Sequence, residues 1–253
     1  METQSLKVYW RPGCSSCVRV KEFLSNLGID YESVNVSATP AAMDDLRALG
    51  VRTVPVVSRG RDYVFAQELA DVSRFIGRQV EFRRLPAPAL MEKWLNVLAT
   101  AQRHIAQIPA ARLGERATEG RDRSIRDLAY HIYQVADAFL QAVENGREDL
   151  TAVYNAPPPA NVTSAHDVVN FGREITKRVE AWWARQSDKT CSGTVRTYYG
   201  VQPLHHLLER STWHSAQHAR QIIAVLEELG VKVDRPLGEK DYAGLPMPAG
   251  VWE

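Results

Sequence analysis

The sequence predicts an α/β domain followed by an all-α antiparallel four-helix bundle. Three observations support this fold class. Strand and helix signals alternate over the first 80 residues, four long amphipathic stretches follow them, and a charged, proline-marked connector separates the two patterns. A chain of 253 residues is long enough for two domains of ordinary size.

The first 80 residues alternate between strand and helix patterns. Gly28 and Gly50 stand where the first two helices should stop. Strands that alternate with short helices imply a sheet with at least one parallel pair. The expected strands are 7–10, 31–36, 54–57 and 63–65, and the expected helices are 16–27, 40–49 and 68–76.

Strand signals nearly vanish after the connector Arg83-Arg84-Leu85-Pro86-Ala87-Pro88. We therefore expect domain boundaries at 1–80 and 84–253. Four amphipathic stretches of similar length follow, separated by breaks that contain Gly or Pro, as an antiparallel four-helix bundle requires. The four expected helices are about 88–108, 124–145, 164–187 and 203–229.

Composition and charge exclude some classes of partner. Hydrophobic residues make up 45% of the chain, and 31 Lys and Arg oppose 30 Asp and Glu for a net charge of +1. A broad nucleic-acid or membrane surface would need clustered basic residues, so we expect neither partner. Charged residues such as Lys7 and Arg11 interrupt the N-terminal apolar stretch, and no window approaches the roughly 20 apolar residues of a membrane span. These absences predict a cytoplasmic protein.

Two of the three cysteines form the motif Cys14-Ser15-Ser16-Cys17, between the first expected strand and the first expected helix. A thiol at a helix N-terminus faces unpaired N–H groups and the positive end of the helix dipole, which stabilise the thiolate. Arg11 adds a cation nearby. We therefore expect Cys14 to be the catalytic nucleophile and Cys17 the resolving thiol that attacks the mixed disulfide.

Two other interpretations of this motif are half of a zinc site and a pair of inert thiols. A structural zinc needs four ligands, and the sequence has no second C-x-x-C. Thr53-Val54-Pro55 favours the redox interpretation, because a proline at the start of an expected strand needs an edge or a special turn. The third cysteine, Cys191, is expected to be a loop thiol without a function.

This part of the chain resembles the glutaredoxin family, which has the thioredoxin fold. The matching runs are Val8-Tyr9-Trp10-Arg11-Pro12-Gly13-Cys14, Asp30-Tyr31-Glu32-Ser33-Val34-Asn35-Val36 and Gly50-Val51-Arg52-Thr53-Val54-Pro55. The resemblance implies an α/β thioredoxin-like domain in which Pro55 is cis and lies beside Cys14. It also implies that Arg11, Thr53, Val54 and Pro55 bind a thiol or peptide, with backbone hydrogen bonds from Val54.

The sequence departs from the family pattern at two places. Ser15-Ser16 replaces the common Pro-Tyr dipeptide, and Ala66-Gln67-Glu68 replaces the glycine-rich pair and acidic residue that help to hold glutathione. Thiol–disulfide chemistry survives both changes. The expected partners are therefore a low-molecular-weight thiol, either glutathione or another, and a protein disulfide.

All seven histidines lie beyond residue 80. His214 and His218 are four residues apart in an expected helix, which places both imidazoles on one face. Two nitrogens rarely suffice for a metal ion, and His131, in the middle of another expected helix, is the best candidate for a third ligand. The spacing alone leaves open a structural role for each histidine. The weaker candidates are His104, His166, His205 and His206.

The second half of the chain resembles the DinB-like superfamily of four-helix-bundle proteins. The matching segments are Ser124-Ile125-Arg126-Asp127-Leu128-Ala129-Tyr130-His131, Trp213-His214-Ser215-Ala216-Gln217-His218-Ala219-Arg220-Gln221-Ile222 and Gly244-Leu245-Pro246-Met247-Pro248. The resemblance implies a divalent metal ion at His131, His214 and His218. Imidazole suits zinc, nickel, iron or copper, so the ligands do not select the metal.

Three functions remain open at this point. Three imidazoles and a water molecule are typical of a catalytic metal site, and the DinB-like superfamily includes thiol-dependent enzymes. The leading interpretation is a metal-dependent S-transferase or isomerase that uses a low-molecular-weight thiol and an electrophilic small molecule. The alternatives are a glutaredoxin-like disulfide oxidoreductase whose bundle serves docking or homodimerisation, and a metal-responsive binding protein without turnover.

Overall fold

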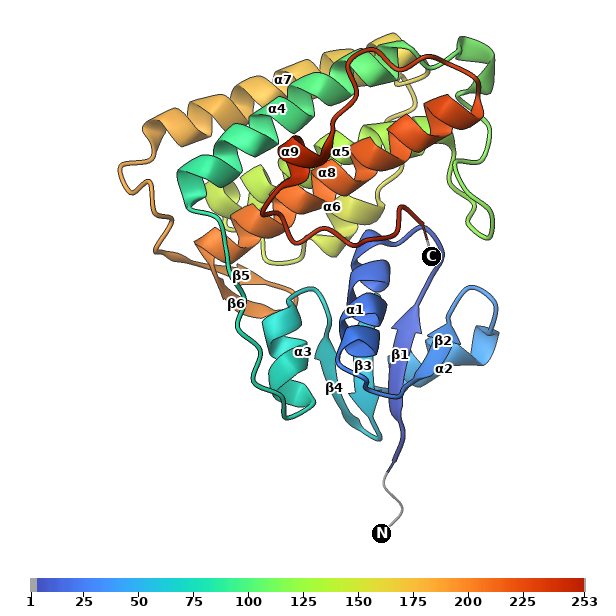
Figure 1. Cartoon of the computed structure of the whole chain (residues 1–253), viewed down its shortest axis with the longest axis vertical. Helices are drawn as coiled ribbons and strands as arrows, with labels where there is room; N and C mark the ends of the chain where they lie inside the picture. The colour runs from blue at the N-terminus through green and yellow to red at the C-terminus, as the bar shows by residue number, and fades with distance from the viewer. Residues whose placement is uncertain (1–3, 253) are drawn as a thin grey trace. The chain divides into compact units, whose positions relative to one another are not determined.

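The computed structural model describes residues 4–252, which form two compact units (Figure 1). The first unit comprises residues up to Arg83 together with the segment 118–121 and the residues from Pro248 onward. The second comprises 84–117 and 122–247. Within the described residues, no helix is long and apolar enough to cross a membrane.

The first unit is a mixed sheet with helices on both faces. Strand β1 (Leu6–Trp10) pairs in parallel with β2 (Glu32–Asn35). On its other side β1 pairs antiparallel with β3 (Val56–Arg59), which in turn pairs antiparallel with β4 (Asp62–Phe65). The strand order is β2-β1-β3-β4, so β1 and β3 are central. This is the α/β thioredoxin-like arrangement that the sequence predicts.

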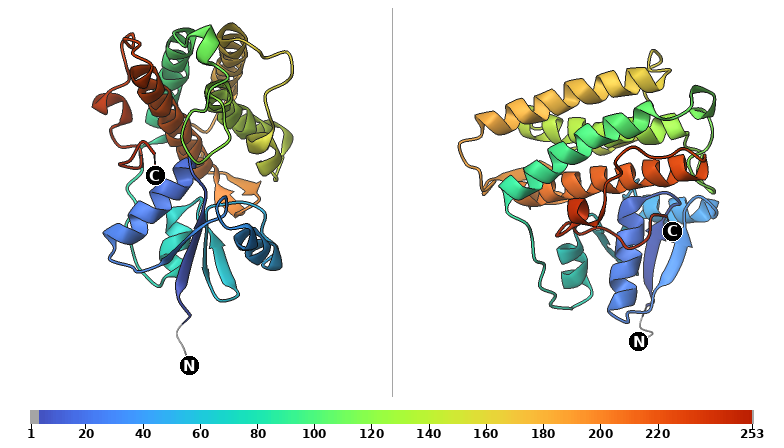
Figure 2. Two further views of the ribbon diagram at one scale, coloured as in Figure 1. Left: turned by 90° about the vertical axis from the view of Figure 1, so that its right-hand side faces the viewer. Right: turned by 45° about the horizontal axis from the view of Figure 1, so that its top comes forward.

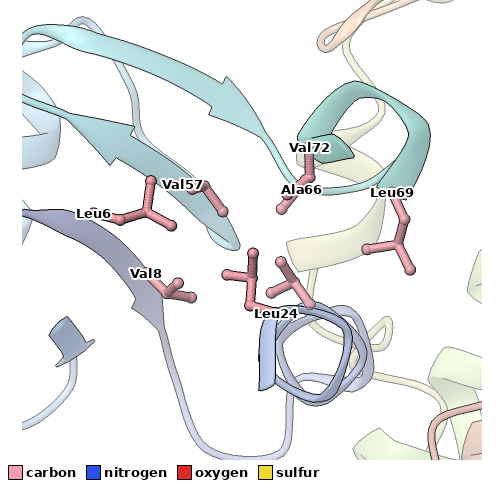
Figure 3. Close-up of a cluster of buried hydrophobic side chains, with 8 residues drawn as sticks. Leu6, Val8, Leu24, Val57, Ala66, Leu69 and Val72 are labelled. Carbon is pink, nitrogen blue, oxygen red and sulfur yellow. The ribbon is translucent and has the colours of Figure 1, made fainter. Parts of the chain in front are cut away.

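Two apolar clusters occupy the two faces of this sheet. Side chains alternate along a strand, so Leu6 and Val8 of β1 belong to one cluster and Tyr9 to the other. The first cluster also contains Leu24 of α1 (Ser15–Asn26) and Leu69 of α3 (Leu69–Phe75), which are drawn with the side chains of the sheet in Figure 3. The opposite cluster contains residues of α2 (Pro40–Ala48) and the buried Cys17. The redox motif is therefore anchored in the core.

The second unit is a bundle of the four long helices that the sequence predicts, each within a few residues of its expected bounds. They are α4 (Ala87–Ala106), α5 (Ile125–Asn145), α7 (Ala165–Arg185) and α8 (Leu204–Glu228). Both α4 and α5 pack against α7 and α8. In the core, the ring of Phe139 stands edge-on to Trp94 and Trp182, with centroids 5.1 and 4.8 Å away.

Two of the four helices run in one direction along the bundle axis, and the other two run in the opposite direction. Arg178 and Arg185 of α7 pair with Asp137 and Glu144 of α5 in the same ascending order, so α5 and α7 run in one direction. The helices α4 and α8 run together in the other direction, as the ribbon in Figure 2 shows. Each helix therefore has one parallel and one antiparallel neighbour, and the connection 146–164 must travel the length of the bundle.

Several short elements lie outside the sequence prediction. A hairpin of β5 (Thr194–Thr197) and β6 (Gly200–Pro203) precedes α8, and the helices α6 (Thr151–Asn155) and α9 (Glu239–Tyr242) lie in connections. A 3-10 turn spans Ala110–Arg112. The sequence analysis did not indicate these elements, and a single helical turn contains too few residues to show a periodicity.

Candidate functional site

The redox motif begins the first helix. Cys14 is the N-cap residue of α1, with extended backbone (φ -101°, ψ 100°), and its carbonyl accepts the N–H groups of Cys17 at 2.8 Å and Val18 at 3.1 Å. The two sulfurs are joined in a disulfide with the Cα atoms 5.2 Å apart. Cys14 is half-buried and Cys17 is fully buried. Cys14 is therefore the more exposed cysteine of the pair.

The segment before β3 lies against this motif. The Val54–Pro55 peptide bond is cis, as the resemblance implied. Val54 and Cys17 share an apolar cluster onto which Cys14 packs. Thr53, which precedes Val54, is half-buried. The carbonyl of Val54 accepts a hydrogen bond from Nε2 of Gln67 at 3.5 Å.

Three imidazoles meet where α5 packs against α8. His131 of α5 and His214 and His218 of α8 each bring a ring nitrogen to within 4.8 Å of the others. Their exposed fractions are 7%, 8% and 1%, and their ring centroids lie between 4.8 and 5.6 Å apart. The antiparallel packing of these two helices joins a mid-chain histidine to the later pair.

Two glutamines orient these imidazoles. Nδ1 of His131 donates to Oε1 of Gln134 at 2.9 Å, and Nδ1 of His218 donates to Oε1 of Gln221 at 2.6 Å. Gln134 in turn donates to the carbonyl of Ala156 at 2.8 Å. An amide oxygen only accepts, so the proton of each ring is on Nδ1 and the lone pair is on Nε2.

Sequence reasoning missed these glutamines, although the signal was present. The spacing His-x-x-Gln occurs at His131 and Gln134, at His214 and Gln217, and at His218 and Gln221. Residues three apart are neighbours on a helix surface, so each glutamine lies beside its histidine. Gln217 is fully buried like Gln221.

The environment keeps His131 neutral. Burial lowers the pKa of His131 well below its usual range, and the charge of Arg123 and the two neighbouring histidines act in the same direction. A neutral imidazole is the form that binds a metal ion. Three buried imidazoles, of which His131 is kept neutral and two have a fixed tautomer, therefore fit a divalent cation.

A tyrosine and a buried arginine border the imidazoles. The ring of Tyr154 in α6 lies 6.2 Å from the rings of both His131 and His214. Its hydroxyl accepts a hydrogen bond from Nη1 of Arg210 at 3.0 Å, and the Arg210 guanidinium lies 5.2 Å from the Tyr154 ring centre. Sequence analysis did not single out either residue. The signal for Arg210 is its position, because it precedes His214 by four residues and so lies on the same face of α8.

His104, His166, His205 and Cys191 do not belong to this group of imidazoles. His104 contacts the carbonyl of Asp234 at 3.2 Å, and His205 contacts that of Leu85 at 2.8 Å. His166 is exposed on α7. Cys191 is buried with a left-handed backbone (φ 55°), and burial raises the pKa of its thiol.

Known proteins resemble the two parts of the chain differently. The glutaredoxin family model matches residues 6–64. Glutaredoxin-like protein NrdH of Salmonella typhimurium is 41% identical over 56 residues, which are 22% of this chain and 69% of that protein. N-acetyl-S-hydroxy-L-cysteine reductase of Bacillus subtilis is 38% identical over 58 residues, 22% of this chain and 62% of that protein. The solved structure of a DinB-like protein from Bacillus cereus covers 58% of this chain and 95% of its own, with a TM-score of 0.48 and 19% identity. Through its first unit, this chain belongs to the glutaredoxin family.

Proposed function

We propose that the protein is an enzyme with two sites: a dithiol–disulfide exchange site at Cys14 and Cys17, and a metal site in the bundle that serves a thiol-dependent transfer or isomerisation. One observation carries the second half of this proposal. Three buried imidazole nitrogens lie within 4.8 Å of one another in a chain that also has a glutaredoxin domain. A thiol-handling domain in the same chain as such a site favours chemistry that uses a thiol.

At the first site, the reduced Cys14 thiolate attacks a disulfide and forms a mixed disulfide, while the other substrate sulfur leaves as a thiolate. The Cys17 thiolate then attacks the Cys14 sulfur, which releases the second substrate thiolate and forms the Cys14–Cys17 disulfide. Two electrons pass to the substrate. Arg11, Thr53, Val54 and Pro55 are proposed to bind the substrate thiol or peptide at this sulfur.

At the second site, His131, His214 and His218 would hold a divalent ion such as zinc, nickel or iron. The bound ion would supply Lewis acidity and favour the deprotonated form of a thiol or water. Arg210 and Tyr154 add a positive charge and a hydroxyl group beside the imidazoles. These two residues favour a substrate that carries an anionic group such as a carboxylate.

Metal analysis and one histidine variant test this proposal. The protein, purified without chelators, should contain about one divalent ion per chain, and His131→Ala should lose it. The same variant should lose the reaction of cysteine or glutathione with a chlorodinitrobenzene electrophile. His166→Ala, at an exposed histidine of the same bundle, is the matched control. Equal rates in the wild type and His131→Ala would overturn the transferase or isomerase function.

Cysteine variants test the first site separately. Cys14→Ser should abolish reduction of hydroxyethyl disulfide, whereas Cys17→Ser should retain some monothiol exchange. His131→Ala should leave disulfide reduction unchanged. A chain that reduces disulfides but neither binds metal nor reacts with electrophiles would instead be a disulfide oxidoreductase with a non-catalytic bundle.

A further inference from the structure

We propose that Arg121, a residue outside the glutaredoxin match, is a positioning residue that stabilises the Cys14 thiolate. The match ends at residue 64, yet the segment 118–121 belongs to the same compact unit as the redox motif. Nη1 of Arg121 donates a hydrogen bond to the carbonyl of Gly13 at 2.6 Å. Gly13 directly precedes Cys14, so this bond ties the guanidinium to the active-site loop.

Close packing accompanies the hydrogen bond. Gly13 has a left-handed backbone (φ 64°), and a Cβ atom added there would lie 3.1 Å from Cδ of Arg121 and 3.3 Å from Cγ2 of Thr118. A Cβ atom added to Gly120 would lie 3.1 Å from Cγ of Pro12. Two glycines thus allow two backbone segments to approach closely. The segment 118–121 is packed onto the loop along both the stem and the tip of the arginine.

The charge of Arg121 is suited to a thiolate. A guanidinium stays protonated at every relevant pH, and a nearby cation favours the charged form of a cysteine. The dipole of α1 acts on Cys14 in the same direction. Other charged groups on the elements around this loop are Arg11, Arg19, Lys21, Glu22, Arg52 and Glu119.

Two of these groups, Lys21 and Glu22, contact residues outside the active-site loop. The ammonium of Lys21 lies 3.9 Å from the ring centre of Trp10. The carboxylate of Glu22 accepts the N–H groups of Ala249 at 2.8 Å and Gly250 at 2.9 Å. Arg121 instead bonds the loop itself, one residue from the nucleophile.

The inference rests on the proposed role of Cys14 as nucleophile and is tested on the full chain. In a Cys17→Ser, Cys191→Ser background, the pKa of Cys14 is measured from the pH dependence of its alkylation rate and of thiolate absorbance. Arg121→Met keeps the stem that packs on Gly13 and removes the charge. It should raise the pKa of Cys14 by roughly 0.5 to 1 unit.

Two further variants separate charge from hydrogen bonding. Arg121→Gln keeps a donor for the Gly13 carbonyl without the charge and should raise the pKa as much as Arg121→Met, whereas Arg121→Lys should keep most of the wild-type value. Arg116→Ala, which removes a cation exposed on the same connection and paired with Asp122, should not change it.

The outcomes are distinct for the two proposals. A Cys14 pKa that is the same in the Met, Gln and wild-type proteins, with disulfide reduction intact, overturns the role of Arg121 and leaves the redox function standing. A wild-type Cys14 that does not react at any pH up to its ordinary thiol range overturns both.

Discussion

Nδ1 of His218 lies 2.6 Å from Oε1 of Gln221, one turn further along α8. The same relationship joins His131 to Gln134 on α5 at 2.9 Å. Two helices that are distant in sequence thus use one device, an amide oxygen that accepts the Nδ1 proton of a buried imidazole. These hydrogen bonds orient the two rings through contacts within each helix and leave the lone pair on Nε2, the nitrogen proposed to bind the metal.

Replacement of an orienting glutamine should weaken metal binding. Gln134→Leu removes the acceptor for His131 Nδ1 without changing a proposed ligand, and the affinity for a divalent ion should fall about 10- to 100-fold. Competition with a chromophoric chelator measures this. Gln141→Leu, on the same helix but bonded to Asp137, should bind as the wild type does. An unchanged affinity in Gln134→Leu would contradict the orienting role.

The reduced protein should show two classes of thiol. Cys14 is half-buried at a helix N-terminus, whereas burial raises the pKa of the Cys191 thiol. A raised pKa means that less thiolate is present at neutral pH, so iodoacetamide should modify Cys14 first and leave Cys191 intact until the pH is raised or the chain unfolds. Peptide mass spectrometry against time checks the order. Faster alkylation of Cys191 than of Cys14 would contradict it.

The core of the bundle should not tolerate a side chain at Gly172. A Cβ atom there would run into the ring of Tyr133, whose hydroxyl donates to the carbonyl of Leu98 at 3.2 Å. Gly172→Ala should therefore lower the free energy of unfolding by about 1–3 kcal/mol, measured by urea denaturation. Gly114→Ala serves as the control, since a Cβ atom there meets nothing within 4 Å. Equal stability of the two variants would contradict the predicted clash between a Cβ atom at position 172 and the ring of Tyr133.

The start of α7 should contribute a pH-dependent stability. The Ser164 side chain accepts the N–H of Asp167, and hydrogen bonds from the hydroxyl and N–H of Ser164 and the N–H of Thr163 lower the pKa of Asp167 to about 2. Because this pKa is below its unfolded value, the contribution is complete above about pH 4 and is lost as the pH falls toward 2.

Ser164→Ala should therefore cost about 1 kcal/mol of stability at pH 7 and less near pH 2. Thermal unfolding at the two pH values checks this. Asp122→Asn, at a carboxylate that is 96% exposed, should show no such difference. A Ser164→Ala cost that does not depend on pH would argue against the coupling to Asp167.

Much of the fold was readable from local patterns. The four long helices and the strands of the first unit follow from periodicity and glycine stops, and the glutaredoxin runs implied the cis bond at Pro55. The hairpin before α8 and the single turn of α6 were missed. The directions of α5 and α7 were also not readable, because amphipathicity shows which face of a helix is buried and not which way its neighbour runs.

The sequence by itself determined that Cys14 stands at a helix start and that His214 and His218 share a helical face, since both facts depend on the backbone geometry of a few consecutive residues. The sequence also named His131 as the partner of these two histidines, and the structure brings a nitrogen of its ring to within 4.8 Å of theirs. Only the tertiary structure decided that Tyr154 approaches the imidazoles and that Arg121 approaches Gly13. Contacts between residues far apart in sequence depend on the combined packing of many side chains from separate elements. The spacing of residues within one segment does not specify that packing.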